Sequence, residues 1–213
     1  AHLLIDCSRS MGFKCGTQRK LDYSCYAAAA IAFIMIQQRD AVGVASFDDR
    51  IRMHLAASSR RSQLNLILTH LDDLQPAGGT NLAANLHTLA DRLHRRGLIV
   101  LFSDLLDEPA EVINALQHFR HKKHEVLLFH LLDQAELDLP YKGITRFRDM
   151  EGTREITLNP ALLRDEYLRR LHLFIDTYRQ ACSRLKIDYV PANTATAYDD
   201  FLCAYLTKRA RLG

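Results

Sequence analysis

The sequence predicts an α/β domain with a mainly parallel central sheet, and three observations support this fold class. Short apolar runs alternate with longer helical patterns along nearly the whole chain, so successive strands need helical crossovers. Two of these runs, HLLID and GLIVLFSD, end in an aspartate and are apolar enough to be buried on both faces. A further pair of strand-like runs is joined by a tight turn, which predicts an antiparallel edge strand.

The first part of the chain contains a buried strand, a buried helix and the edge hairpin. Residues 2–6 are the short apolar run HLLID, and residues 20–40 are too long for a strand and rich in Ala, Ile and Met. The strand-like runs 41–47 and 51–57 flank an acidic turn at residues 48–50, which predicts the antiparallel pair.

The middle of the chain shows two amphipathic helices, a second buried strand and a further helix. Residues 59–75 place leucine and isoleucine at the i, i+3, i+4, i+7 spacing of a helix, which Pro76 ends. Residues 82–96 repeat this spacing and predict a second helix. The apolar run 97–104 predicts a buried strand, and residues 109–123 predict the next helix.

The same alternation continues to the end of the chain. The expected elements are a strand at 125–132, a hairpin at 144–158 with its turn at Glu151-Gly152, a helix at 160–185, a strand at 187–192 and a helix at 197–209. There is no internal repeat, low-complexity segment or obvious linker, so we expect one domain over residues 1–213. Because the chain begins Ala-His directly on a strand, we expect it to be part of a longer protein.

Composition excludes some classes of function. The formal net charge of +3 over 213 residues, with no Trp, does not favour nucleic acid as a partner. Five cysteines without a C-x-x-C pair favour free thiols in a reducing compartment, so we expect a cytoplasmic location. No apolar run is long enough to span a membrane and no leader is evident; membrane association would need a segment absent from this chain.

Oxygen-bearing side chains gather at the predicted strand ends. They are Asp6, Ser8 and Ser10 after the first strand, Thr80 after a Gly-Gly pair, and Asp104 after the strand at 97–104. Ligands of an open parallel sheet bind at the carboxyl ends of its strands, where the strand order reverses. Carboxylate and hydroxyl oxygens suit Mg²⁺, Mn²⁺ or Ca²⁺ better than zinc. Turns and helix N-caps are the alternative explanation, because Ser, Thr and Asp favour both.

The pattern Asp6-x-Ser8-x-Ser10, with GGTN and FSD later in the chain, resembles the metal-ion-dependent adhesion site of von Willebrand factor type A domains. In order, the stretches KLDY, RDAVGVASFDDRIR, GGTNLAANL, RRGLIVLFSDLLDEP and FRDMEG resemble the bacterial family called domain of unknown function 58. This resemblance implies a Rossmann-like, three-layer α/β/α domain of von Willebrand A type. It also implies that Ser8 and Ser10 bind the metal through their hydroxyls, that Asp6 holds it directly or through water, and that Thr80 and Asp104 complete the shell.

The function that the resemblance implies is non-catalytic protein binding that depends on a divalent metal. A bound Mg²⁺ would take an Asp or Glu of a protein partner as its last ligand, and the resemblance makes a MoxR-type AAA+ ATPase, in an assembly or chaperone system, the partner to expect.

A Mg²⁺-dependent phosphohydrolase of the haloacid dehalogenase type is the main alternative. Asp6 would be the nucleophile, Thr80 would hold the phosphate, and Asp104 with Asp107 would bind the metal. This chemistry usually needs a second aspartate two residues after the first as general acid, and that position is Ser8. No G-x-S-x-G elbow or P-loop motif supports other enzyme classes.

Overall fold

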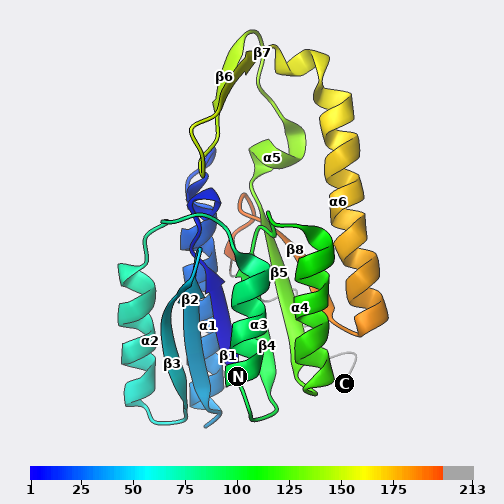
Figure 1. Cartoon of the computed structure of the whole chain (residues 1–213). Helices are drawn as coiled ribbons and strands as arrows, with labels where there is room; N and C mark the ends of the chain where they lie inside the picture. The colour runs from blue at the N-terminus through cyan, green and yellow to red at the C-terminus, as the bar shows by residue number, and fades with distance from the viewer. Residues whose placement is uncertain (199–213) are drawn as a thin grey trace.

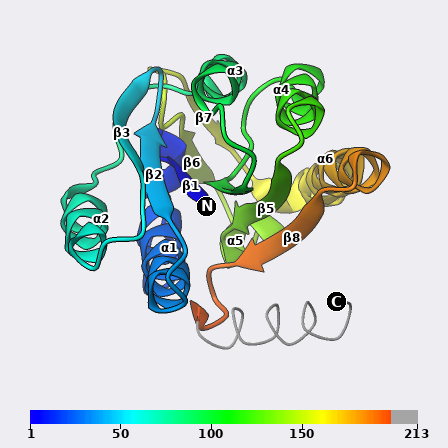
Figure 2. The same ribbon diagram turned by 90° about the horizontal axis from the view of Figure 1, so that it is seen from below.

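The structure, a computed structural model that describes residues 1–198, is built on a six-stranded sheet between two layers of helices (Figures 1 and 2). The strand order is β3-β2-β1-β4-β5-β8, and every neighbouring pair is parallel except β2 with β3. The strands are β1 (His2–Asp6), β2 (Val42–Phe47), β3 (Ile51–Ser58), β4 (Leu98–Ser103), β5 (Glu125–Leu132) and β8 (Asp188–Asn193). The predicted mainly parallel sheet with an antiparallel edge strand is confirmed.

The two faces of the sheet carry separate hydrophobic cores. The helices are α1 (Lys20–Gln37), α2 (Ser62–Asp73), α3 (Leu82–Arg92), α4 (Pro109–His121), α5 (Gln134–Asp138) and α6 (Arg164–Leu185). Successive residues of a strand point to opposite faces, so Leu3 and Ile5 pack with α1 and α2, while Leu4 packs with α3, α4 and α6. Figure 2 shows these two groups of helices on opposite sides of the sheet. Both faces of β1 are therefore buried, as its apolar sequence predicts.

A projecting arm stands beyond the carboxyl edge of the sheet (Figure 1). It consists of the antiparallel pair β6 (Thr145–Arg148) and β7 (Glu155–Leu158), the short 3₁₀ helix η2 (Pro160–Leu162) and the first turns of α6. This pair forms a sheet of its own, separate from the six-stranded one. The arm lies beyond the carboxyl ends of the strands, which is where the candidate site residues lie.

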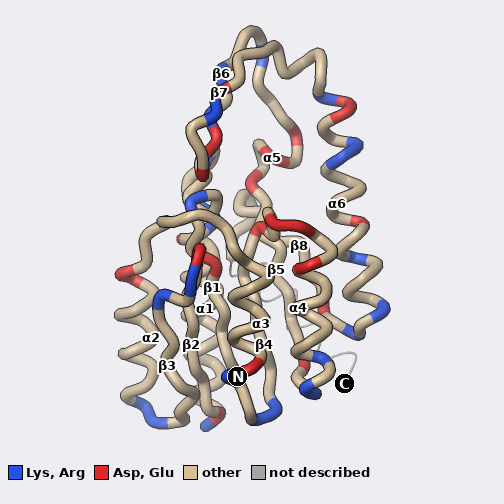
Figure 3. The backbone as a smooth tube through the Cα atoms, viewed as in Figure 1, with Lys and Arg blue, Asp and Glu red and all other residues tan. Residues whose placement is uncertain are grey.

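Figure 3 shows charged residues of both signs along α6. Glu166 pairs with Arg169 at 2.7 Å and with Arg170 at 2.6 Å, and these guanidinium groups lower the pKa of Glu166 to about 2. Such exposed pairs add little stability. The helix is instead held by its buried face, including Tyr178 and Cys182.

Several boundaries differ from the sequence prediction. The helix expected over 82–96 ends at Arg92, because Leu93 adopts an extended conformation and is buried in the core. The helix expected over 160–185 is divided: η2 is followed by Leu163, and α6 begins at Arg164. The short helix α5 and the 3₁₀ turn η1 (Arg9–Gly12) were not predicted, since each is too short to show a period. The helix expected over 197–209 lies almost wholly outside the described residues.

Within residues 1–198, no helix has both the length and the apolar character that crossing a bilayer requires. The cysteines in this range, Cys7, Cys15, Cys25 and Cys182, form no disulfide, while Cys203 lies outside it.

Replacing Gly43 by alanine tests the close approach of β2 and β3. A Cβ atom there would lie 2.7 Å from the carbonyl oxygen of Leu55 and 2.8 Å from the backbone nitrogen of Ala57. We expect Gly43→Ala to lower the free energy of unfolding by about 1–3 kcal/mol, as overpacking does. Urea denaturation measures this. A Cβ on Gly97 would meet nothing within 4 Å, so Gly97→Ala is the control, and equal midpoints for the two variants would contradict the packing described.

Candidate functional site

The strand order brings Asp6 and Asp104 to the same edge of the sheet. β1 lies between β2 and β4, and the register pairs Ile5 with Phe102, so the two parallel strands end side by side. Asp6 is the last residue of β1, and Asp104 follows directly after the last residue of β4. Strand topology alone thus assembles two of the predicted site residues.

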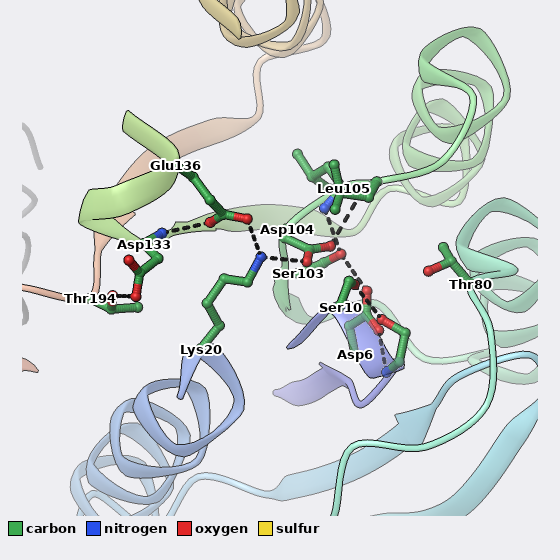
Figure 4. Close-up of polar contacts among 12 residues, drawn as sticks. Asp6, Ser10, Lys20, Thr80, Ser103, Asp104, Leu105, Asp133, Glu136 and Thr194 are labelled. Atoms are coloured by element: carbon green, nitrogen blue, oxygen red, sulfur yellow. Dashed lines mark hydrogen bonds and ion pairs between the residues drawn. The ribbon is translucent and has the colours of Figure 1, made fainter. Parts of the chain in front are cut away.

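Asp6 is held in a fixed orientation by two hydrogen bonds (Figure 4). The backbone N–H of Ser8 donates to Oδ1 at 2.9 Å, and the hydroxyl of Ser103 donates to Oδ2 at 2.6 Å. Only 1% of Asp6 is exposed. This burial, together with the nearby charge of Asp104, raises the pKa of Asp6 to about 7 despite the two hydrogen bonds. A cation next to Asp6 would favour its charged form.

Ser8 and Ser10 place two hydroxyls beside this carboxylate. Their Oγ atoms lie 3.1 Å apart, and both residues are buried where the chain leaves β1 and enters η1. Neither side chain caps a backbone N–H of the turn: Ser8 is the residue before η1, and its side chain makes no cap hydrogen bond. The alternative explanation of Ser8 as a helix cap is therefore not supported.

Asp104 makes a buried ion pair that the sequence analysis did not anticipate. Its Oδ2 atom lies 2.8 Å from Nζ of Lys20, which is also 2.8 Å from Oε1 of Glu136 (Figure 4). The side chain of Lys20 is 0% exposed. Burial disfavours its ammonium, but the two carboxylates outweigh this effect and raise the pKa of Lys20 above its usual range. One oxygen of a predicted metal ligand is thus already paired with a cation.

Thr80 lies across from these residues, on the loop before α3 (Figure 4). This loop depends on Gly78, whose φ of +65° favours glycine. A Cβ atom added at this position would lie 2.6 Å from Oδ2 of Asp48. Thr80 donates two hydrogen bonds to Glu151: its N–H to Oε2 at 2.8 Å and its hydroxyl to Oε1 at 2.6 Å. Its hydroxyl therefore contacts a residue of the projecting arm.

The donor set fits a hard divalent cation in its chemistry. Ser8, Ser10 and Thr80 offer hydroxyl oxygens, and Asp6 and Asp104 offer carboxylates, which are the ligand types of Mg²⁺. In the described part of the chain, no group of three or more His, Cys, Asp or Glu side chains is arranged to hold a metal ion. A cation at this edge would thus depend on the hydroxyls, and that it binds here remains a prediction.

Three residues of the site were not singled out from the sequence: Lys20, Glu136 and Glu151. Lys20 and Glu151 do lie in two of the stretches that carry the family resemblance, KLDY and FRDMEG. Their roles depend on contacts between residues 71 to 116 positions apart, which no local pattern shows.

Cys7 belongs to the core and not to the site. It packs in the same cluster as Leu3 and Ile5, and its thiol donates to the carbonyl oxygen of Phe47 at 3.2 Å. Burial raises the pKa of Cys7 to about 12, so the reactive thiolate is disfavoured. Cys7 is therefore a core residue and not a nucleophile of the site.

Comparison with known proteins identifies the family. The model of the family described as "Protein of unknown function DUF58" matches residues 1–172. This chain belongs to the DUF58 family. The DUF58 chain is 30% identical over 174 residues to the uncharacterized proteins Mb1516 of Mycobacterium bovis and Rv1480 of Mycobacterium tuberculosis. The match covers 78% of this chain and 53% of theirs, so the chain spans about half the length of these curated relatives.

Solved structures similar to the DUF58 chain share its fold. The conserved hypothetical protein BatB from Bacteroides thetaiotaomicron superposes with a TM-score of 0.64 at 15% identity, covering 99% of this chain and 98% of that one. The SpRpn10 VWA domain superposes with a TM-score of 0.51 at 16% identity, covering 94% and 92%. These matches confirm the von Willebrand A-type fold.

Replacing Lys20 by methionine tests the buried ion pair in the DUF58 chain. Without the ammonium, Asp104 and Glu136 lose their shared counter-ion, and the carboxylate of Asp104 is buried. We expect Lys20→Met to lower the free energy of unfolding by about 3–5 kcal/mol, the usual cost of breaking a buried pair. Lys14→Met, at an exposed position, is the control. Equal urea midpoints for the two variants would show that the pair contributes nothing.

The raised pKa of Asp6 predicts a pH dependence of stability. Its pKa is 3.8 in an unfolded chain and about 7 here, so between these values the folded metal-free protein binds more protons. Its contribution to the free energy of unfolding therefore falls as pH rises through this window. As pH rises from 5 to 8, we expect the free energy of unfolding of wild type to fall relative to that of Asp6→Asn. Thermal unfolding in EDTA measures it, and a difference independent of pH would contradict the raised pKa.

Proposed function

We propose that this chain is a non-catalytic protein-interaction domain that works through a divalent cation, most simply Mg²⁺. Asp6, Ser8, Ser10, Thr80 and Asp104 would hold the cation. The observation that supports the proposal is the buried group of Asp6, Ser8 and Ser10 at the carboxyl end of β1, where a fixed carboxylate meets two hydroxyls.

The chemistry of the donor set makes this site suited to a carboxylate from a partner. Mg²⁺ prefers six oxygen ligands and keeps water where protein oxygens are lacking. When bound, the cation supplies a positive charge that attracts an Asp or Glu side chain. Asp6 is oriented by Ser8 and Ser103, so this chain would present a preformed half of the shell. The loops around the site would select the partner.

A MoxR-type AAA+ ATPase is the partner we propose to test first, as part of an assembly or chaperone system. Support for this partner comes from membership in the DUF58 family, whose resemblance implies such an ATPase.

The contacts of Asp6 and Asp107 do not favour the phosphohydrolase alternative. Both oxygens of Asp6 accept hydrogen bonds, and Ser8 replaces the general acid that a nucleophilic aspartate needs. Asp107, the second acid of that scheme, accepts the N–H of Ala83 at 3.1 Å and the N–H of Glu108 at 2.7 Å. Asp107 thus accepts from one backbone group in the first turn of α3 and from one directly before α4.

Thermal unfolding with and without Mg²⁺ tests the proposal. Binding at a cation concentration 100 times the Kd stabilises a folded protein by about 2.7 kcal/mol. At roughly 2–4 °C per kcal/mol for this size of domain, we expect a rise in Tm of several degrees for wild type. The double variant Ser8→Ala/Ser10→Ala should lose it, while Ser59→Ala, at an exposed position, should keep it.

The same preparations test the partner and the alternative. Capture of the MoxR-type ATPase by wild type should need Mg²⁺ and fail with EDTA or with Asp6→Ala. Equal capture in all samples would overturn the dependence on metal. Hydrolysis of an aryl phosphate that requires Mg²⁺ and is abolished by Asp6→Asn would support a phosphohydrolase and overturn the proposal.

A further inference from the structure

The turn between β6 and β7 places a carboxylate of this same chain on the candidate site. Both oxygens of Glu151 accept hydrogen bonds from Thr80, one from its backbone N–H and one from its hydroxyl. Thr80, an expected metal ligand, therefore donates a hydrogen bond to each oxygen of this carboxylate. This contact joins the projecting arm to the loop that precedes α3.

The turn itself is built to hold Glu151 in this position. The N–H of Asp149 donates to the carbonyl oxygen of Arg154 at 2.9 Å, and the N–H of Glu151 donates to Oδ1 of Asp149 at 2.9 Å. A Cβ on Gly152 would lie 2.5 Å from Oδ2 of Asp149, so a larger residue there would displace the carboxylate that accepts the N–H of Glu151. The local bonds of the turn thus fix the backbone from which Glu151 extends.

Glu151 lines a cavity together with residues of the main domain body. A cavity of about 360 Å³ is lined by Ser10 and Lys20 from the body of the domain and by Asp149, Met150 and Glu151 from the arm. Ser10 is an expected ligand, and Lys20 neutralises another, Asp104. Glu151 therefore contacts one expected ligand, Thr80, and lines the same cavity as another, Ser10, and both Glu151 and Thr80 are only partly buried.

From this arrangement we infer that Glu151 is an in-chain ligand of the cation and occupies the position of the partner's Asp or Glu. The inference rests on the proposed function, since it assigns the carboxylate that completes the same site. A ligand tethered to its site has a high effective concentration, of the order of millimolar for a short flexible connection. A partner's carboxylate must then displace Glu151, which makes the arm a determinant of which partners bind.

Water relaxation by bound Mn²⁺ tests the assignment, because it reports how many water molecules the bound cation keeps. We compare wild type with Glu151→Gln, whose amide can still accept a hydrogen bond from Thr80, and with Glu151→Ala. The control is Glu155→Gln, which changes an exposed glutamate of β7 that pairs with Arg146 and Arg148 at 3.9 Å. Far-ultraviolet circular dichroism confirms that each variant is folded.

We expect both Glu151 variants to raise the relaxivity of each bound Mn²⁺ and to weaken Mn²⁺ binding at least about tenfold, as loss of supporting groups at metal sites does. Glu155→Gln should match wild type. Adding acetate should lower the relaxivity of Glu151→Ala more than that of wild type, because acetate takes the place of the missing carboxylate.

The outcomes separate this inference from the proposed function. If every protein binds Mn²⁺ with the same relaxivity, Glu151 is not a ligand, and the inference fails while the metal site stands. If Glu151→Gln weakens binding without a change in relaxivity, Glu151 only orients Thr80, and the inference again fails. If wild type binds no Mn²⁺ at all, both the inference and the proposed function are overturned.

Discussion

The buried ion pair between Lys20 and Asp104 is the interaction on which the candidate site depends. Asp6 and Asp104 end adjacent strands, so parallel topology brings two carboxylates together where each residue is only 1% exposed. Such a pair of like charges is costly to bury unless a counter-ion is present. Lys20, at the start of α1, supplies one to Asp104, while Asp6 accommodates the remaining repulsion through its raised pKa. The first turn of α1 is thereby fixed against the sheet edge.

A consequence of this pairing is that the two carboxylates are not equivalent. Asp104 shares its counter-ion with Glu136 of α5, so its charge is balanced within the fold. Asp6 has only neutral hydrogen-bond donors, the hydroxyl of Ser103 and the N–H of Ser8. Any added cation would therefore gain most from Asp6, whose charge is the one left uncompensated. The two hydroxyls of Ser8 and Ser10 lie on that side of the pair.

The strands, though not their order in the sheet, were largely predictable from the sequence, because buried parallel strands have a distinct apolar signature. HLLID and LIVLF show it clearly, and an aspartate after each identified the carboxyl edge. Metal ligation itself remains untested. Contacts made by long side chains across the fold were not predictable: Lys20 looked like the polar start of a helix, and its partners lie 84 and 116 residues away. Short elements such as α5 were missed because a five-residue helix depends on its cap, Asp133, more than on periodicity.

β5 and β8 are adjacent strands of the sheet, yet the chain between them contains α5, the separate β6–β7 sheet, η2 and α6. Only the later part of α6 belongs to the core, through residues such as Ile175 and Tyr178. The arm before it, from β6 to η2, contributes no strand to the main sheet. The sheet and the arm are thus two separately built parts of one chain, and the contact between Thr80 and Glu151 is where the arm meets the loop before α3.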